Sequence, residues 1–173
     1  MNNYIFGYGS LINLESLYKT IGRRINKDEL IVTALADYSR IWNYKANVFS
    51  ACLKKNIDAV YLNLTESKGN SINGIVFQVT DSEMKNLNKR EKYYKLVEVT
   101  DSIQASINAR IYTYICNDIE HIADTVNGSY VMQKYIDIVV DGCKEFGDIF
   151  KEEFIKTIKE IPFEIVEGDY SFI

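Results

Sequence analysis

The chain has 173 residues, of which 47% are hydrophobic and 13% aromatic, and its net charge is −4. A chain of this length and composition is expected to fold as one domain, residues 1–173, with a well-packed core. The acidic balance and the lack of a strongly basic segment argue against a nucleic acid partner. No apolar run reaches the roughly 18 residues of a membrane span, and no leader precedes the first apparent strand. We therefore expect a soluble cytoplasmic protein with no membrane partner.

Apolar and turn-forming residues predict seven strands and four helices. The predicted strands are Tyr4–Tyr8, Leu30–Ala36, Tyr38–Tyr44, Ala59–Leu64, Ile72–Val79, Tyr94–Thr100 and Arg110–Cys116. The predicted helices are Leu14–Ile21, Ser82–Arg90, Tyr130–Cys143 and Asp148–Ile161. The turn-forming residues of Thr65–Ser71 predict a hairpin between two of the strands. Strands dominate the first two-thirds and helices the last third, which favours an α+β fold with a curved or closed sheet covered by helices.

The cysteines and the histidine offer little chemistry. Cys52, Cys116 and Cys143 are odd in number and have no paired spacing, so we expect reduced, buried thiols. His121 is the only histidine and stands in a polar stretch, where a surface residue is expected. A His-rich metal site and a Ser/His triad with a spare base are therefore disfavoured, and we expect no metal.

One carboxylate stands in an unexpected position. Thr80 and Glu83 have the spacing of a capping box, and Met84 and Leu87 mark the apolar side of the helix that follows. Glu91 comes seven residues after Met84, so on a helical wheel it points within about 20° of the same direction. A glutamate buried in this way suits a general acid/base, because burial raises its pKa. The alternative is that the helix ends before Glu91 and the carboxylate is solvated.

A glycine-rich turn follows the first strand. Residues 7–11 read Gly-Tyr-Gly-Ser-Leu, and a helix is predicted just beyond them. Glycines let backbone N–H groups turn toward a ligand, and a helix start adds positive dipole, so such a loop can hold a carboxylate or an oxyanion. The segment is too short for a dinucleotide fingerprint, and no lysine follows the serine as in a P-loop. A tight strand-to-helix turn with no ligand explains these residues equally well.

Together these features resemble the γ-glutamylcyclotransferase superfamily along nearly the whole chain. The matching blocks are Phe6-Gly7-Tyr8-Gly9-Ser10-Leu11, then Gly74–Phe77 with Leu87–Tyr94 and Val97–Val99, and finally Ser129 with Tyr135–Gly142 and Phe146-Gly147. The resemblance implies a small mixed β-barrel surrounded by helices, and an enzyme that needs no cofactor. Its partner would be a small-molecule γ-glutamyl substrate, whose α-amine attacks its own γ-carbonyl to release 5-oxoproline and an amine or amino acid.

The same resemblance assigns roles to individual residues. Glu91 matches the general acid/base of the superfamily, and the backbone amides of the loop match its substrate-holding segment. The implied substrate-binding residues are Gly7, Tyr8, Gly9, Ser10, Leu11, Tyr94 and Tyr135. Tyr94 lies slightly closer to the glutamate than in the usual pattern, so Tyr93 is an alternative for its position. Tyr94 as the start of a strand, and Tyr135 as ordinary helix core, are the structural alternatives.

The sequence leaves the substrate and the oligomeric state open. Leu11 stands where many members of the superfamily have asparagine and resembles the glutathione-acting branch, which the C-terminal block does not closely follow. Candidate substrates are glutathione, γ-glutamyl amino acids, γ-glutamylamines or a γ-glutamyl-protected metabolite. The other functional hypotheses are a non-catalytic module that binds a small ligand on the same fold, and a different amide or amine rearrangement.

Overall fold

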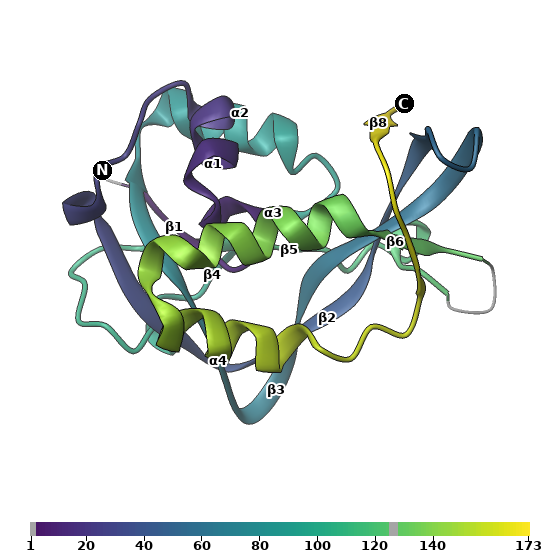
Figure 1. Ribbon diagram of the computed structural model, residues 1–173. Helices are drawn as coiled ribbons and strands as arrows, with labels where there is room; N and C mark the ends of the chain where they lie inside the picture. Colours follow the sequence, from purple (N-terminus) through teal and green to yellow (C-terminus); the bar gives the residue numbers. More distant parts are fainter. Residues whose placement is uncertain (1–2, 125–127) are drawn as a thin grey trace.

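The computed structural model describes residues 3–124 and 128–173. Within these residues the chain forms one eight-stranded mixed sheet and four α-helices (Figure 1). The strands are β1 (Asn3–Gly7), β2 (Leu30–Ser50), β3 (Lys55–Val79), β4 (Lys95–Glu98), β5 (Ile111–Ile115), β6 (Tyr130–Met132), β7 (Glu164–Val166) and β8 (Tyr170–Phe172). The helices are α1 (Leu14–Ile21), α2 (Asp81–Arg90), α3 (Gln133–Cys143) and α4 (Asp148–Ile158). The predicted α+β fold class is confirmed.

The sheet is curved, with β1 near its centre. The strand order is β4-β5-β1-β3-β2-β8, and β1 pairs antiparallel with β3 and parallel with β5. Two isolated bridges, Leu35 to Ile103 and Tyr44 to Ile122, join β2 to the segments before and after β5. Because β2 and β5 lie on opposite sides of β1 in this order, the bridges bring the two sides of the sheet together. This curvature agrees with the small mixed barrel that the resemblance implies.

The two longest strands differ from the prediction. The sequence predicts that strands end near residue 37 and over Thr65–Ser71. In the structure β2 continues through the first position and β3 through the second. Asp37 has a φ of 63°, and its carboxylate accepts a hydrogen bond of 2.8 Å from the N–H of Gly69. The turn-forming residues therefore build a bulge inside a β2–β3 ladder. The hairpin predicted at Thr65–Ser71 is wrong, and the chain reverses at residues 51–54 instead.

The helices follow the sequence more closely. Helix α1 has the predicted bounds, and α2 begins at the predicted capping box, with both reciprocal bonds between Thr80 and Glu83 present. Residues Tyr130–Met132 form β6 and not the first turn of α3, and α4 ends at Ile158, three residues early. Helices α3 and α4 lie side by side, and α1 packs against α2 (Figure 1). In the described residues no helix is both long enough and apolar enough to cross a membrane.

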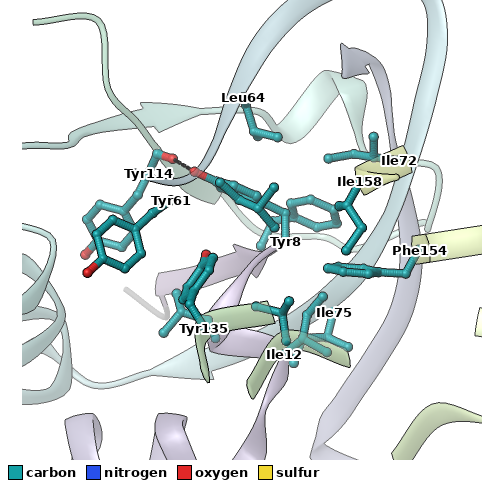
Figure 2. Packing of buried hydrophobic residues seen from close by; sticks show 14 of the residues in the cluster. Tyr8, Ile12, Tyr61, Leu64, Ile72, Ile75, Tyr114, Tyr135, Phe154 and Ile158 are labelled. Carbon is teal, nitrogen blue, oxygen red and sulfur yellow. Dashed lines mark hydrogen bonds between the residues drawn. The ribbon is translucent and has the colours of Figure 1, made fainter. Parts of the chain in front are cut away.

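The core is mostly aliphatic and aromatic, but tyrosines gather at one side of it. Figure 2 shows Tyr61, Tyr114 and Tyr135 on one side of the cluster and Ile158 with Phe154 on the other. Tyrosine supplies an apolar ring and a polar hydroxyl, so this side of the core is suited to border a polar cavity. Of the thiols, Cys116 and Cys143 are buried as expected, whereas Cys52 is exposed, contrary to the prediction.

Candidate active site

The glycine loop connects β1 to α1 and exposes backbone donors. Ser10–Ile12 form a single 3-10 turn, and Asn13 then caps α1 by accepting from the N–H of Ser16 at 2.9 Å. The N–H groups of Ser10 and Leu11 precede the first hydrogen bond of the turn, so they have no acceptor within it. No other oxygen of the described residues accepts from them either. The loop therefore offers two adjacent N–H donors to a ligand.

A buried arginine on β2 fixes the shape of this loop. Arg40 is 7% exposed and donates through Nε to the backbone carbonyl of Tyr8 at 2.8 Å. The Tyr8 hydroxyl donates in turn to the carbonyl of Tyr114 at 2.8 Å, as the dashed line in Figure 2 shows. The Arg40 guanidinium also lies 4.0 Å from the centre of the Phe154 ring. Burial lowers the pKa of Arg40 to about 9, so it remains charged at neutral pH.

Glu91 stands just past the last residue of α2. It is the C-cap residue, and its N–H donates to the carbonyl of Leu87 at 2.8 Å. The helix therefore ends before Glu91, as the alternative interpretation of the sequence expected. The side chain is nevertheless only 15% exposed, so the carboxylate is not in open solvent. Burial raises the pKa of Glu91 above that of an ordinary glutamate, and the neighbouring Arg90 opposes this in part. The carboxyl group thus has the environment of a general acid/base.

Arg90 joins the end of α2 to the glycine loop and to α1. Its Nε lies 3.1 Å from Oε1 of Glu91, and its Nη2 donates to the hydroxyls of Ser10 at 2.7 Å and Ser16 at 3.1 Å. Its Nη1 donates to the carbonyl of Ser16 at 3.2 Å and to the hydroxyl of Thr20 at 2.5 Å. The four hydrogen bonds account for the N–H groups of Nη1 and Nη2, while Nε forms an ion pair with the carboxylate. The arginine therefore holds the carboxylate and the loop in one arrangement.

Tyrosines surround the carboxylate. Tyr94 donates to the carbonyl of Leu62 at 3.0 Å, and the Tyr135 hydroxyl stands 3.2 Å from where a Cβ on Gly9 would lie. Burial raises the pKa of both hydroxyls, and the proximity of Glu91 adds to the effect. These phenols consequently stay neutral at physiological pH and act as hydrogen-bonding groups, not as anions.

Two adjoining cavities meet at these residues. The larger has a volume of about 440 Å³, within the range of small-molecule pockets. The smaller, of about 30 Å³, reaches under the glycine loop. The residues that line both are Ser10, Glu91, Tyr94 and Tyr135. The smaller cavity adds Phe6, Tyr8, Gly9, Leu11, Leu62 and Tyr114, and the larger adds Ser16, Tyr44, Tyr61, Arg90, Ile138, Tyr170 and Phe172.

Most of the residues selected from the sequence lie at these cavities. Gly7 does not line them; it ends β1 behind the loop, where a Cβ would stand 3.1 Å from that of Leu11. Tyr94 lines both cavities, whereas Tyr93 is 39% exposed and stacks on His121 with 3.7 Å between ring centres. Within residues 3–124 and 128–173, no group of three or more metal-binding side chains comes together.

Sequence reasoning missed the aromatic side of the larger cavity. Tyr44 and Tyr61 lie in the continuous strands β2 and β3, and Tyr170 and Phe172 belong to the three-residue strand β8. The alternation of aromatic residues at 170 and 172 was the available signal, because alternating side chains of a strand share a face. Arg90 was also missed, since it falls outside the apolar stripe of the helical wheel.

Comparison with known proteins supports the fold. No family model matches the sequence, and no curated protein matches it. A solved γ-glutamyl cyclotransferase superposes with a TM-score of 0.64 at 16% identity, covering 89% of this chain and 86% of its own. YkqA from Bacillus subtilis gives 0.65 at 16% identity, over 94% of this chain and 56% of its own. A glutathione-specific γ-glutamyl cyclotransferase from yeast gives 0.51 at 15% identity, over 70% and 72%. The chain therefore has the γ-glutamylcyclotransferase-like fold.

Proposed function

We propose that the protein is a γ-glutamylcyclotransferase-like enzyme, which converts a γ-glutamyl amide into 5-oxoproline and a free amine or amino acid. One observation carries the proposal: the largely buried carboxyl of Glu91 lines the same cavity as the loop of Ser10 and Leu11, whose N–H groups have no acceptor among the described residues. The reaction needs one group that moves a proton and one that stabilises an oxyanion, and this cavity offers both.

The chemistry balances with one carboxylate. Glu91 takes a proton from the substrate α-ammonium, and the freed amine attacks the γ-carbonyl carbon to form the ring C–N bond. The carbonyl oxygen becomes an oxyanion, which the loop N–H groups stabilise. When the original amide C–N bond breaks, Glu91 returns the proton to the departing nitrogen. The ring nitrogen also loses its second proton, which the released amine takes up as it becomes an ammonium ion. No water is consumed and Glu91 ends as it began, while closure within one molecule supplies the proximity.

The surrounding residues hold the glutamyl group in this scheme. Ser10 and Leu11 supply backbone donors, and the small side chain of Gly9 leaves space beside the Tyr135 hydroxyl. Tyr94 and Tyr135 contact the substrate as neutral phenols, while Gly7 and Tyr8 shape the loop. The substrate is a small molecule, and neither a nucleic acid nor a membrane takes part.

The test is a panel of γ-glutamyl compounds incubated with the protein, with 5-oxoproline measured by mass spectrometry. Glu91→Gln should lower kcat by about 10²-fold or more, because general acid/base groups contribute at least that much. Glu153→Gln, at an exposed position in α4, is the matched control and should leave kcat unchanged. Near-normal turnover in Glu91→Gln would refute the acid/base role. If no compound yields 5-oxoproline but some still bind, the non-catalytic binding module becomes the better description.

A further inference from the structure

The C-terminal strand β8 forms one wall of the larger cavity. Its backbone pairs with β2, opposite Val48–Ser50, which places Tyr170 and Phe172 at the cavity. Asp169 anchors the segment, since its carbonyl accepts from the N–H of Ala51 at 2.9 Å and its carboxylate lies 2.5 Å from Nζ of Lys134. The wall is thus held by main-chain pairing as well as by side-chain packing.

Four of the seven residues that line only the larger cavity are aromatic. Phe172 stacks on Tyr61 with 5.9 Å between ring centres and 24° between planes, and Tyr44 packs on Tyr94 at 4.3 Å. The buried Tyr61 hydroxyl has no hydrogen-bond partner of normal geometry among the described residues, although the nearby Tyr170 contributes, after burial, to raising its pKa. The rings of Tyr44, Tyr61 and Phe172 give this wall an aromatic surface against which an apolar or aromatic group can pack.

The charges at the cavity disfavour an anionic group on that molecule. Arg90 and Glu91 are the charged residues among those that line it, and they pair with each other. Nη1 and Nη2 of Arg90 already donate four hydrogen bonds and Nε faces Glu91, so a carboxylate would have to displace one of these partners. The free loop N–H groups belong to the glutamyl end of the substrate. Lys45 and Lys92 do not line the larger cavity; they line an adjoining cavity of about 490 Å³, which shares Tyr44, Arg90 and Phe172 with it.

We propose, building on the proposed function, that the departing group of the substrate is an aromatic or apolar amine without a carboxylate. With the glutamyl group against the loop and its amide at Glu91, the amine substituent extends among Tyr61, Tyr170 and Phe172. Aromatic walls bind such a substituent by apolar burial and ring packing. A carboxylate there would lose its hydration close to the Glu91 carboxylate, and the Nη groups of Arg90 already have acceptors. The pocket therefore selects γ-glutamyl amides of aromatic amines over γ-glutamyl amino acids and peptides.

The experiment compares γ-glutamyl-phenethylamide with γ-glutamyl-phenylalanine, which differ only by the carboxylate on the departing group. We expect kcat/KM to be at least about tenfold higher for the phenethylamide, a difference of about 1.4 kcal/mol. A second pair, γ-glutamyl-phenethylamide and γ-glutamyl-ethylamide, isolates the aromatic ring and should also differ by about tenfold. Equal or higher kcat/KM for γ-glutamyl-phenylalanine would overturn the proposal.

Two variants distinguish an effect of the β8 wall on substrate preference from an effect on the fold as a whole. Phe172→Ala should lower kcat/KM for the phenethylamide about tenfold and change that for the ethylamide less than twofold. Lys92→Ala, at a residue that lines the adjoining cavity but not the larger one, is the matched control and should leave the preference unchanged. A preference that disappears in Lys92→Ala, or an equal loss with both amides in Phe172→Ala, would contradict the assignment.

Turnover and binding measured separately distinguish an error in the proposed reaction from an error in the proposed substrate class. Dissociation constants of the same compounds are measured by calorimetry with Glu91→Gln, which cannot turn them over in the proposed scheme. Tighter binding of the phenethylamide than of γ-glutamyl-phenylalanine supports the aromatic, carboxylate-free pocket even if no 5-oxoproline is ever formed. Turnover without that preference in kcat/KM or in binding keeps the enzyme and rejects the substrate class.

Discussion

Replacing Arg90 should separate two effects that this side chain combines. Its guanidinium fastens α2 to the glycine loop through Ser10 and to α1 through Ser16 and Thr20, and it also lies 3.1 Å from the Glu91 carboxylate. Arg90→Met removes both the fastening and the charge. Arg90→Lys keeps the charge but lacks the planar fork, so it cannot reach the same set of acceptors.

The size of the effect on stability follows from the bonds that are lost. Five contacts at about 0.5–1.5 kcal/mol each would sum to roughly 5 kcal/mol, but the arginine side chain is 27% exposed and its partners can be rehydrated. We therefore expect both variants to lose about 2–3 kcal/mol of unfolding free energy. For a domain of this size that corresponds to a decrease in Tm of roughly 5–10 °C.

The effect on activity has a distinct pH signature. Arg90 holds the pKa of Glu91 below the value that burial alone would give, so Arg90→Met raises that pKa further. The ionised fraction of Glu91 at a given pH then falls, and the acid limb of the kcat/KM profile moves to higher pH. Arg90→Lys should move it less. The tyrosines around Glu91 have pKa values raised by burial, so they add no titration in this range.

Thermal unfolding and pH-rate profiles of the two variants are compared with Lys89→Met, an exposed neighbour on the same helix. Lys89→Met should change neither quantity. If Arg90→Met lowers the Tm but leaves the acid limb in place, the charge of Arg90 does not act on the Glu91 carboxyl. If neither the Tm nor the pH profile changes, Arg90 does not hold α2 against the glycine loop and α1.

Three further changes test the site and its support. The pKa of Glu91 is raised in the folded protein, so its ionised form destabilises the fold at neutral pH. Glu91→Gln should therefore have a Tm equal to or higher than that of the wild type at pH 7, and the difference should shrink as the pH falls. A lower Tm at pH 7 would contradict the burial of the charge. Gly9→Val should weaken substrate binding, since a Cβ there lies 3.2 Å from the Tyr135 hydroxyl; unchanged affinity in a calorimetric titration would show that the loop does not face the ligand. Gly142→Ala should destabilise the fold by about 1–3 kcal/mol in chemical unfolding, because its Cβ would stand 2.7 Å from the backbone of Asn13; a neutral result would mean that α3 can shift freely.

The sequence predicts local elements well where one signal dominates. The capping box at Thr80 places the start of α2, and Gly22 in the left-handed region ends α1 at the expected residue. Prediction fails where the outcome depends on pairing. Asp37 and Gly69 have the residue types of turns, but the β2–β3 ladder on either side absorbs them as a bulge. Strands of three residues, such as β8, exist only because a neighbouring strand accepts their hydrogen bonds, which local sequence cannot reveal.

The residues of the site likewise divide into those that local sequence predicts and those that only the tertiary fold brings together. The helical wheel predicts that Glu91 points inward. In the structure the residue is the C-cap of α2, and the surrounding tyrosines bury it as much as the helix geometry does. The glycine loop was recognisable because it is contiguous in sequence. The aromatic wall was not, since Tyr44, Tyr61 and Phe172 come from three separate strands. Chemistry that resides in one segment is therefore predictable here, whereas the shape that selects a substrate depends on the tertiary fold.

Arg90 connects the position of Glu91 with the choice of substrate, because it pairs with Glu91 while its Nη1 and Nη2 groups already donate to Ser10, Ser16 and Thr20. Ser16→Ala removes the hydroxyl that accepts from Nη2 at 3.1 Å and so frees one N–H at the cavity. Thr20→Ala frees an N–H on Nη1 instead, at a residue that does not line the cavity. If saturation of the guanidinium sets the charge preference, Ser16→Ala should improve kcat/KM for γ-glutamyl-phenylalanine relative to γ-glutamyl-phenethylamide about three- to tenfold, since one charged hydrogen bond is restored. Thr20→Ala should leave that ratio unchanged. An equal change in both variants would mean that the preference follows the mobility of Arg90, and no change in either would mean that the aromatic wall alone excludes the carboxylate.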